Sequence, residues 1–185
     1  MGPSEILRDL QRQQREHDEK AHKDIYYLSY PSRIKHLTFH VAKYAGRLAE
    51  KGAGSKDYKA TVVDAFIISL SAGEVLLINF GAEVMKWDKA KEHKNLLELG
   101  LALKGNYKVG ELGDWYFRQL AIVAGRMAKA CESLDHMEPV PYRDMLSNSI
   151  IHLCKSSLVA AAVHSIDLVQ KSRERWGAIE SKGIL

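Results

Sequence analysis

Polar side chains inside an otherwise apolar helical segment have the clearest potential for chemistry in this sequence. The segment 57–85 is the most apolar stretch, yet polar residues recur in it at steps of three, seven and three: Thr61, Asp64, Ser71 and Glu74. This spacing places them on one face of a helix. Because an unpaired buried carboxylate costs several kcal/mol, Asp64 requires a cation, a hydrogen-bond donor or water.

The preceding segment, 33–51, carries a complementary row of polar residues: His36, His40, Lys43, Tyr44 and Arg47. We expect Asp64 to face this row. Three interpretations remain open: ion pairs that only join the two helices, a groove that binds a metal ion or a phosphate group, or a mixture of solvent-facing positions. For the groove, the candidate ligand-binding residues are Lys43, Arg47, Asp64 and Glu74.

A metal site is a separate hypothesis. Histidines four residues apart on a helix can bind one transition-metal ion, and His36 and His40 have this spacing. A third ligand is required, and Asp64 or Glu74 would supply it. The last helical segment adds further candidates for a helical-bundle metalloprotein, namely His152, His164 and Asp167. For the pair three residues apart, His164 and Asp167, a hydrogen bond without metal is the simpler interpretation.

The composition narrows the classes of function. The 185 residues carry a net charge of +4 and have a sequence pI of about 9.0, which permits a nucleotide or another acidic partner without selecting one. The sequence has no run of five Lys or Arg residues, so nucleic acid is not an expected partner. Serine-nucleophile, phosphate-loop, dinucleotide-binding and zinc-protease motifs are absent from the sequence.

The sequence also predicts a compartment. No apolar run reaches the eighteen or so uncharged residues of a membrane span, and the N-terminus lacks an apolar signal core, so we expect no membrane association. The two cysteines, Cys131 and Cys154, are too few for a disulfide framework and are expected to be small buried residues. Together these features predict a cytoplasmic protein.

The spacing of apolar residues predicts an all-α fold, with helices at 4–22, 33–51, 57–85, 115–134 and 142–176. Ser32 is the expected N-cap of the second helix. The predicted organisation is an N-terminal charged helix and connector at 1–31, a helical-bundle domain at 32–178 and a tail at 179–185. Only the first turns of the N-terminal helix carry enough apolar residues to pack, so we expect its remainder to be solvated or frayed, or to contact a second copy.

A short internal repeat supports a bundle. The stretch HVAKYAGRLAE (40–50) is similar to QLAIVAGRMAKA (119–130), and each copy precedes a loop and a long apolar helix. One such helix pair cannot bury its own apolar face, so two copies are expected to dock. The predicted core is therefore a four-helix bundle built from two helix-pair repeats.

The stretch AKYAGRLAEKG, followed by ATVVDAFIISLSAGEVLLINFG, resembles the all-α nucleotide pyrophosphohydrolases of the MazG-like superfamily. The resemblance covers about residues 34–84, with a weaker echo at 119–169. In that family, acids in the patterns E-x-x-E and E-x-x-D bind Mg²⁺, which bridges a triphosphate and activates water.

The resemblance implies a nucleotide or another phosphate compound as ligand, with Mg²⁺ as cofactor if the chain is active. At the positions of the four metal-binding acids this chain has Tyr44, Arg47, Thr61 and Asp64. One carboxylate cannot hold the family's metal cluster, whereas Lys43 and Arg47 can pair with phosphate directly. We therefore expect a divergent MazG-like binding protein without ordinary Mg²⁺-dependent pyrophosphohydrolysis. The alternatives are a structural or interaction bundle without a small ligand, and the histidine–carboxylate metalloprotein.

Overall fold

The computed structural model of the protein describes residues 1–51, 56–87, 92–105 and 112–182. Within these residues the chain is all-α, 84% helical and without strands, which confirms the predicted fold class. The helices are, in chain order, α1 (Pro3–Ala21), α2 (Lys23–Tyr26), α3 (Tyr30–Lys51), α4 (Lys56–Leu76), α5 (Phe80–Glu83), the 3₁₀ turn η1 (Val84–Lys86), α6 (Leu96–Lys104), α7 (Leu112–Asp135), α8 (Tyr142–Val163) and α9 (Leu168–Glu180).

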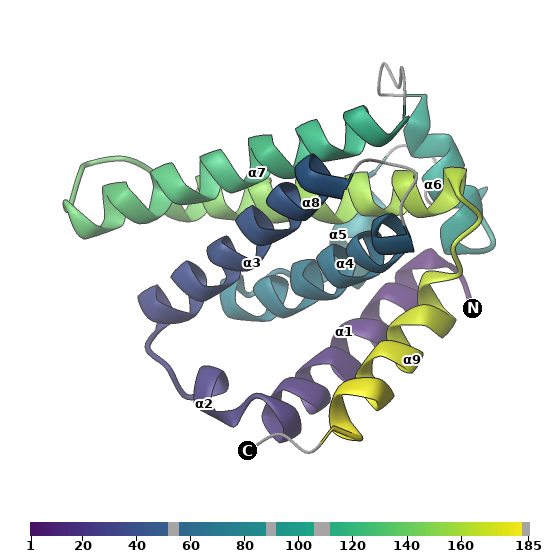
Figure 1. The fold of residues 1–185 in the computed structure, drawn as a ribbon, viewed down its shortest axis with the longest axis horizontal. Helices are drawn as coiled ribbons and strands as arrows, with labels where there is room; N and C mark the ends of the chain where they lie inside the picture. The colour runs from purple at the N-terminus through teal and green to yellow at the C-terminus, as the bar shows by residue number, and fades with distance from the viewer. Residues whose placement is uncertain (52–55, 88–91, 106–111, 183–185) are drawn as a thin grey trace.

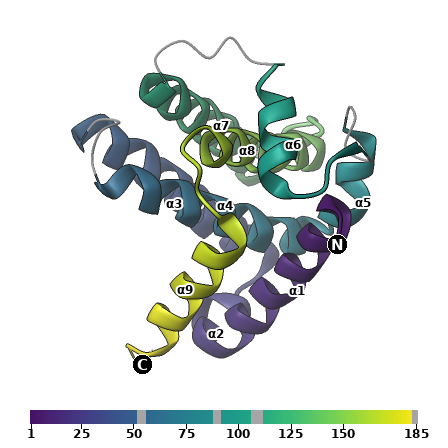
Figure 2. The same ribbon diagram turned by 90° about the vertical axis from the view of Figure 1, so that its right-hand side faces the viewer.

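Four long helices form the centre of the molecule. α3 packs against α7 and α4, and α8 packs against α4 and α7 (Figure 1). α6 covers α8, while α1 and α9 lie on the other side of α4, as the second view shows (Figure 2). The core therefore consists of the helix pairs α3–α4 and α7–α8, which dock side by side. Their origin as a repeat stays a prediction.

The predicted helix 57–85 is wrong at its C-terminal end. α4 ends at Leu76, and the chain bends by 102° before it continues through α5 and η1. Leu77 takes a left-handed conformation with φ of 58°, and the amide of Ile78 donates to the carbonyl of Gly73 at 2.8 Å, which closes the helix end. A Cβ on Gly73 would lie 2.6 Å from a ring carbon of Phe80. The glycine thus lets α5 fold back onto α4.

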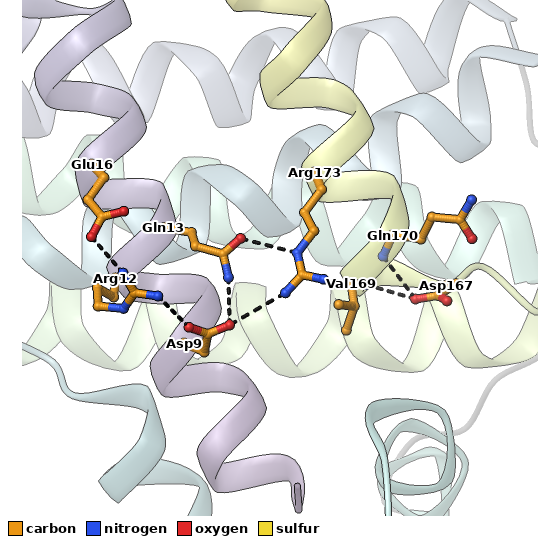
Figure 3. Close-up of polar contacts among 8 residues, drawn as sticks. All are labelled: Asp9, Arg12, Gln13, Glu16, Asp167, Val169, Gln170 and Arg173. Atoms are coloured by element: carbon orange, nitrogen blue, oxygen red, sulfur yellow. Dashed lines mark hydrogen bonds and ion pairs between the residues drawn. The ribbon is translucent and has the colours of Figure 1, made fainter.

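The predicted helix 142–176 is two helices. α8 ends at Val163, Ser165 has φ of 52°, and the amide of Ile166 donates to the carbonyl of Ala161 at 2.8 Å. Asp167 then caps α9, because its Oδ1 accepts from the amides of Val169 and Gln170 (Figure 3). This turn directs α9 away from α8 and alongside α1.

α1 is packed along its whole length, so the expectation that only its first turns would pack is wrong. Its buried positions continue from Leu7 and Leu10 to Ala21, and four of them are polar: Gln11, Gln14, His17 and Asp18. Gln11 shows why polar residues can be buried here, since it donates to the carbonyl of Ile78 at 2.7 Å and accepts from the amide of Phe80 at 3.0 Å. From the sequence pattern, these polar side chains were expected to face solvent.

α1 and α9 also share an exposed polar interface. The guanidinium of Arg173 donates to Gln13 at 3.1 Å and to Asp9 at 3.5 Å (Figure 3). A buried bond reinforces it, because the indole of Trp176 donates to Gln14 at 2.7 Å. The first and last helices therefore hold each other against α4.

α3 begins at Tyr30, three residues before the predicted start, so Ser32 lies inside the helix and is not its N-cap. The amide of Arg33 donates to the carbonyl of Ser29, which is the first backbone bond of this helix. Cys131 and Cys154 are free and buried, as expected.

Among the described residues, one helix, α8, has the length and composition of a membrane span. Within its most apolar window, however, 67% is buried inside the bundle. Because a core helix has the same composition as a span, the apolar character of α8 is accounted for by its packing against α4, α6 and α7.

Two glycines provide a matched test of the packing. A Cβ on Gly100 would lie 2.4 Å from the carbonyl oxygen of Leu158 and 2.7 Å from the Cβ of Ala162, whereas one on Gly125 would meet nothing within 4 Å. Gly100→Ala should therefore lower the free energy of unfolding by about 1–3 kcal/mol. Gly125→Ala should raise it by about 0.5–1 kcal/mol, because alanine favours the helix. Urea denaturation of both variants measures this, and equal effects would contradict the described contact between α6 and α8.

Candidate functional site

A groove of about 1220 Å³ opens between α3, the first turns of α4 and the start of α9. Charged side chains of both signs line it. The cations are Lys43, Arg47, Lys59, Lys171 and Arg175. The acids are Glu50, Asp57, Asp64, Asp167 and Glu174.

Asp64 is the buried charge of the groove. Its side chain is 8% exposed, and both of its oxygens are bound by guanidinium groups. Nε of Arg175 lies 2.8 Å from Oδ1, and Nη1 of Arg47 lies 3.3 Å from Oδ2. The same Nη1 donates to the hydroxyl of Thr61 at 3.3 Å. The prediction that Asp64 faces the polar row of the preceding helix is confirmed, and the residue of that row that binds it is Arg47.

Arg175 was not among the predicted site residues, yet its bond to Asp64 is shorter than the bond from Arg47. The two residues are separated by 111 positions, and α9 reaches the groove only because of the turn at Ser165. The sequence offers no spacing signal for such a pair. A guanidinium near Asp64 was expected only from the neighbouring segment.

Positive charge exceeds negative charge around Asp64. Burial lowers the pKa of the Lys43 ammonium, and the charges of Arg47 and Arg175 lower it further, whereas Asp64 raises it. The Lys43 ammonium and the Arg47 guanidinium both lie over the Tyr44 ring, at 5.1 and 5.3 Å from its centre. Two guanidinium groups therefore share a single buried carboxylate, and the Lys43 ammonium lies 3.3 Å from Nδ1 of His40.

Two of the other acids of the groove are already engaged. Asp167 accepts from two backbone amides at the start of α9. The carboxylate of Glu174 lies 2.6 Å from Nζ of Lys171 and accepts a hydrogen bond from the side-chain Nε2 of Gln170 at 2.7 Å. Neither acid neutralises the cations around Asp64 directly.

A second cavity of about 270 Å³ lies behind the Asp64 cluster, and four histidines line it: His17, His22, His36 and His40. Nε2 of His36 and Nε2 of His40 are 3.0 Å apart. Burial, followed by the charge of Lys43, lowers the pKa of His40 to about 4. Burial also lowers the pKa of His36 and of His22. These three imidazoles are therefore neutral near pH 7.

The predicted metal site lacks a third ligand. His36 and His40 are adjacent, but both oxygens of Asp64 are bound by arginines. In the part of the chain that the structure describes, no group of three His, Cys, Asp or Glu residues is placed to hold a metal ion.

The other predicted ligands lie elsewhere. Glu74 does not join Asp64, because it lines a separate hollow together with Arg15. Burial raises the pKa of its carboxyl group. His152 lies 2.8 Å from Oε1 of Gln119. His164 lies against Tyr58 with the two rings tilted by 58° and their centres 4.6 Å apart. His164 and Asp167 both lie in the turn between α8 and α9, so they do not share the helical face that was predicted for them.

Comparisons with protein families, with curated proteins and with solved structures found no match to this chain. The MazG-like resemblance therefore remains a hypothesis based on the residues quoted above.

Two carboxylates provide a matched test of the Asp64 cluster. Asp64→Asn leaves Arg47 and Arg175 without their buried counter-charge, so the free energy of unfolding should fall by about 1–3 kcal/mol. Asp135→Asn removes an ion pair to Lys35 whose side chains are 49% and 39% exposed, and should change it by less than about 0.5 kcal/mol. Denaturant unfolding at pH 7 measures both, and a neutral Asp64→Asn would show that the cluster contributes no stability.

His40 should make stability depend on pH. Its pKa in the folded state, about 4, lies below the ordinary value of 6.5, so stability is lost as the pH falls from about 6.5 toward 4. After allowance for solvent screening, its contribution to that loss is about 1–2 kcal/mol. His40→Gln should flatten the profile by this amount, and His136→Gln, at an exposed position, should not. Unfolding curves between pH 7 and pH 4 test this, and identical profiles for wild type and His40→Gln would contradict it.

Proposed function

We propose that the protein binds a nucleotide or another phosphate compound in the groove between α3, α4 and α9. The observation that carries this proposal is the charge imbalance around Asp64. Arg47 and Arg175 bind one buried carboxylate and Lys43 lines the same groove, so cations outnumber acids beside Asp64, while the groove as a whole is lined by five cations and five acids. An anion that enters the groove would neutralise that excess.

The donor geometry favours phosphate among small anions. A guanidinium presents several N–H donors in a planar fork that matches phosphate oxygens, and the side chains of Arg47 and Arg175 are still 29% and 42% exposed. Asp64 holds both guanidiniums in place before a ligand arrives. Less ordering is then required on binding, which favours affinity.

The MazG-like resemblance supports binding rather than hydrolysis. Arg47 and Thr61 stand at two of the positions where that family places metal-binding acids, and here the Arg47 guanidinium bonds both Thr61 and Asp64. A cation of the protein itself thus occupies the space between these positions. The residues present do not fit the family's Mg²⁺ cluster, because only Asp64 supplies a carboxylate and arginines bind both of its oxygens.

A structural or interaction bundle without a small ligand is the second candidate. It is favoured by the complete pairing of Asp64, which an internal ion-pair cluster would also show. The two candidates differ in one measurable property. A purely structural cluster gains nothing from added phosphate.

Isothermal titration with inorganic phosphate and with ATP, both without metal, tests the proposal. We expect binding that Arg175→Gln weakens roughly 10–100-fold, since a charge-assisted hydrogen bond contributes about 1.5–3 kcal/mol. Arg173→Gln is the matched control, because Arg173 lies on the same helix but donates to Gln13 and Asp9 of α1. No heat with either compound, or equal weakening by both variants, would overturn the proposal.

The same proteins test the absence of ordinary pyrophosphohydrolysis. We expect no steady pyrophosphate release from nucleoside triphosphates with Mg²⁺ or Mn²⁺. Turnover that Asp64→Ala abolishes would show that the carboxylate holds a catalytic metal after all.

A further inference from the structure

We propose that the histidine-lined cavity behind the groove receives the uncharged part of the bound anion, and that this part is a compact polar head group that hydrogen-bonds to His17. The inference rests on the proposed function, because the groove supplies the site for the phosphate group. No spacing in the sequence relates His17 or His22 to His36 and His40. The packing of α1 against the core brings them to one cavity.

The groove and the cavity share a wall. Lys43, Arg47, Asp64 and Arg175 line both spaces. A phosphate group held by Arg47 and Arg175 would therefore lie next to the cavity. The ion pairs of Asp64 form the wall between the groove and the cavity. A ligand that binds a guanidinium in place of Asp64 would therefore also connect the two spaces.

His17 lines this cavity and carries a buried polar atom without a hydrogen-bond partner among the described residues. Its side chain is 3% exposed, and its Nδ1 lies 3.0 Å from Oε1 of Glu180. Because a carboxylate only accepts, Nδ1 carries the proton. Nε2 is buried, and no hydrogen-bond partner for it lies in the described part of the chain. Leaving such an atom unpaired costs about 1–3 kcal/mol, which a polar group of a ligand would recover.

The rest of the cavity selects for a neutral and compact group. Its volume is about 270 Å³, and aliphatic side chains such as Leu37, Ile67 and Ile68 form part of its wall. Asp18, the other acid on the wall, already accepts from Gln14 and Ser71, each at 2.7 Å. A cationic head group would thus find no free carboxylate. The chemistry fits a small ring that carries a hydrogen-bonding group.

A series of phosphate monoesters tests the inference: inorganic phosphate, methyl phosphate, cyclohexyl phosphate, phenyl phosphate and 4-hydroxyphenyl phosphate. We expect at least one ring-bearing ester to bind more than about tenfold tighter than inorganic phosphate and methyl phosphate, a gain of about 1.4 kcal/mol. His17→Phe, which keeps a ring but removes both nitrogens, should reduce this gain to less than about threefold. Ile68→Phe, which fills the cavity from a half-buried position on α4, should do the same.

The outcomes separate the two proposals. If inorganic phosphate binds and no ester gains affinity, the head-group site is overturned and the phosphate groove stands. If none of the compounds binds, the proposed function fails and the inference fails with it. A gain that persists in both variants would place the head group outside the cavity and overturn the inference.

A direct readout does not depend on the variants. In the wild-type protein, the ¹⁵N resonance of His17 Nε2 should move on addition of the tightest ester and stay in place with inorganic phosphate. A resonance that neither compound moves would overturn the contact with His17.

Discussion

The need to pair one buried carboxylate organises this molecule. Asp64 stands among apolar, buried residues of α4, where an unpaired charge would cost several kcal/mol. Its two oxygens are bound by Arg47 of α3, which precedes it in the chain, and by Arg175 of α9, which follows it. The pairing thus fixes α3 and α9 around α4. It also places two guanidiniums at the wall of a groove, so the same contact serves the fold and prepares the site for an anion.

Half of this cluster could be predicted from the sequence. The helical spacing of Thr61 and Asp64, together with the complementary row on the preceding segment, predicted the contact with Arg47, and the structure confirms it. Arg175 could not be found this way, because only tertiary packing relates residues 111 positions apart. Glu74 shows the opposite error. It was predicted to share a helical face with Asp64, but ten residues along a helix span about 15 Å. Glu74 therefore lines a different hollow, together with Arg15.

The all-α class and the long helices followed from the apolar spacing, but two helix ends did not. Sequence rules look for glycine after a helix, because the closing residue takes a left-handed conformation. This chain closes three helices with Leu77, Met137 and Ser165, whose φ angles are 58°, 52° and 52°. Only the end near Met137 was located, since prolines follow it at 139 and 141. The unsignalled turns at Leu77 and Ser165 are those that direct α5 and α9.

The reach of α9 back to α4 has a consequence for the order of events during synthesis. The core pairs α3–α4 and α7–α8 can assemble before residue 168 emerges from the ribosome, whereas the Asp64 cluster gains its second guanidinium only when residue 175 is available. Until then, a buried carboxylate has one partner and α1 lacks the helix that lies alongside it. A nascent chain would thus form its bundle first and its anion groove last. A chain that stops before α9 would have much of the core but would lack the groove.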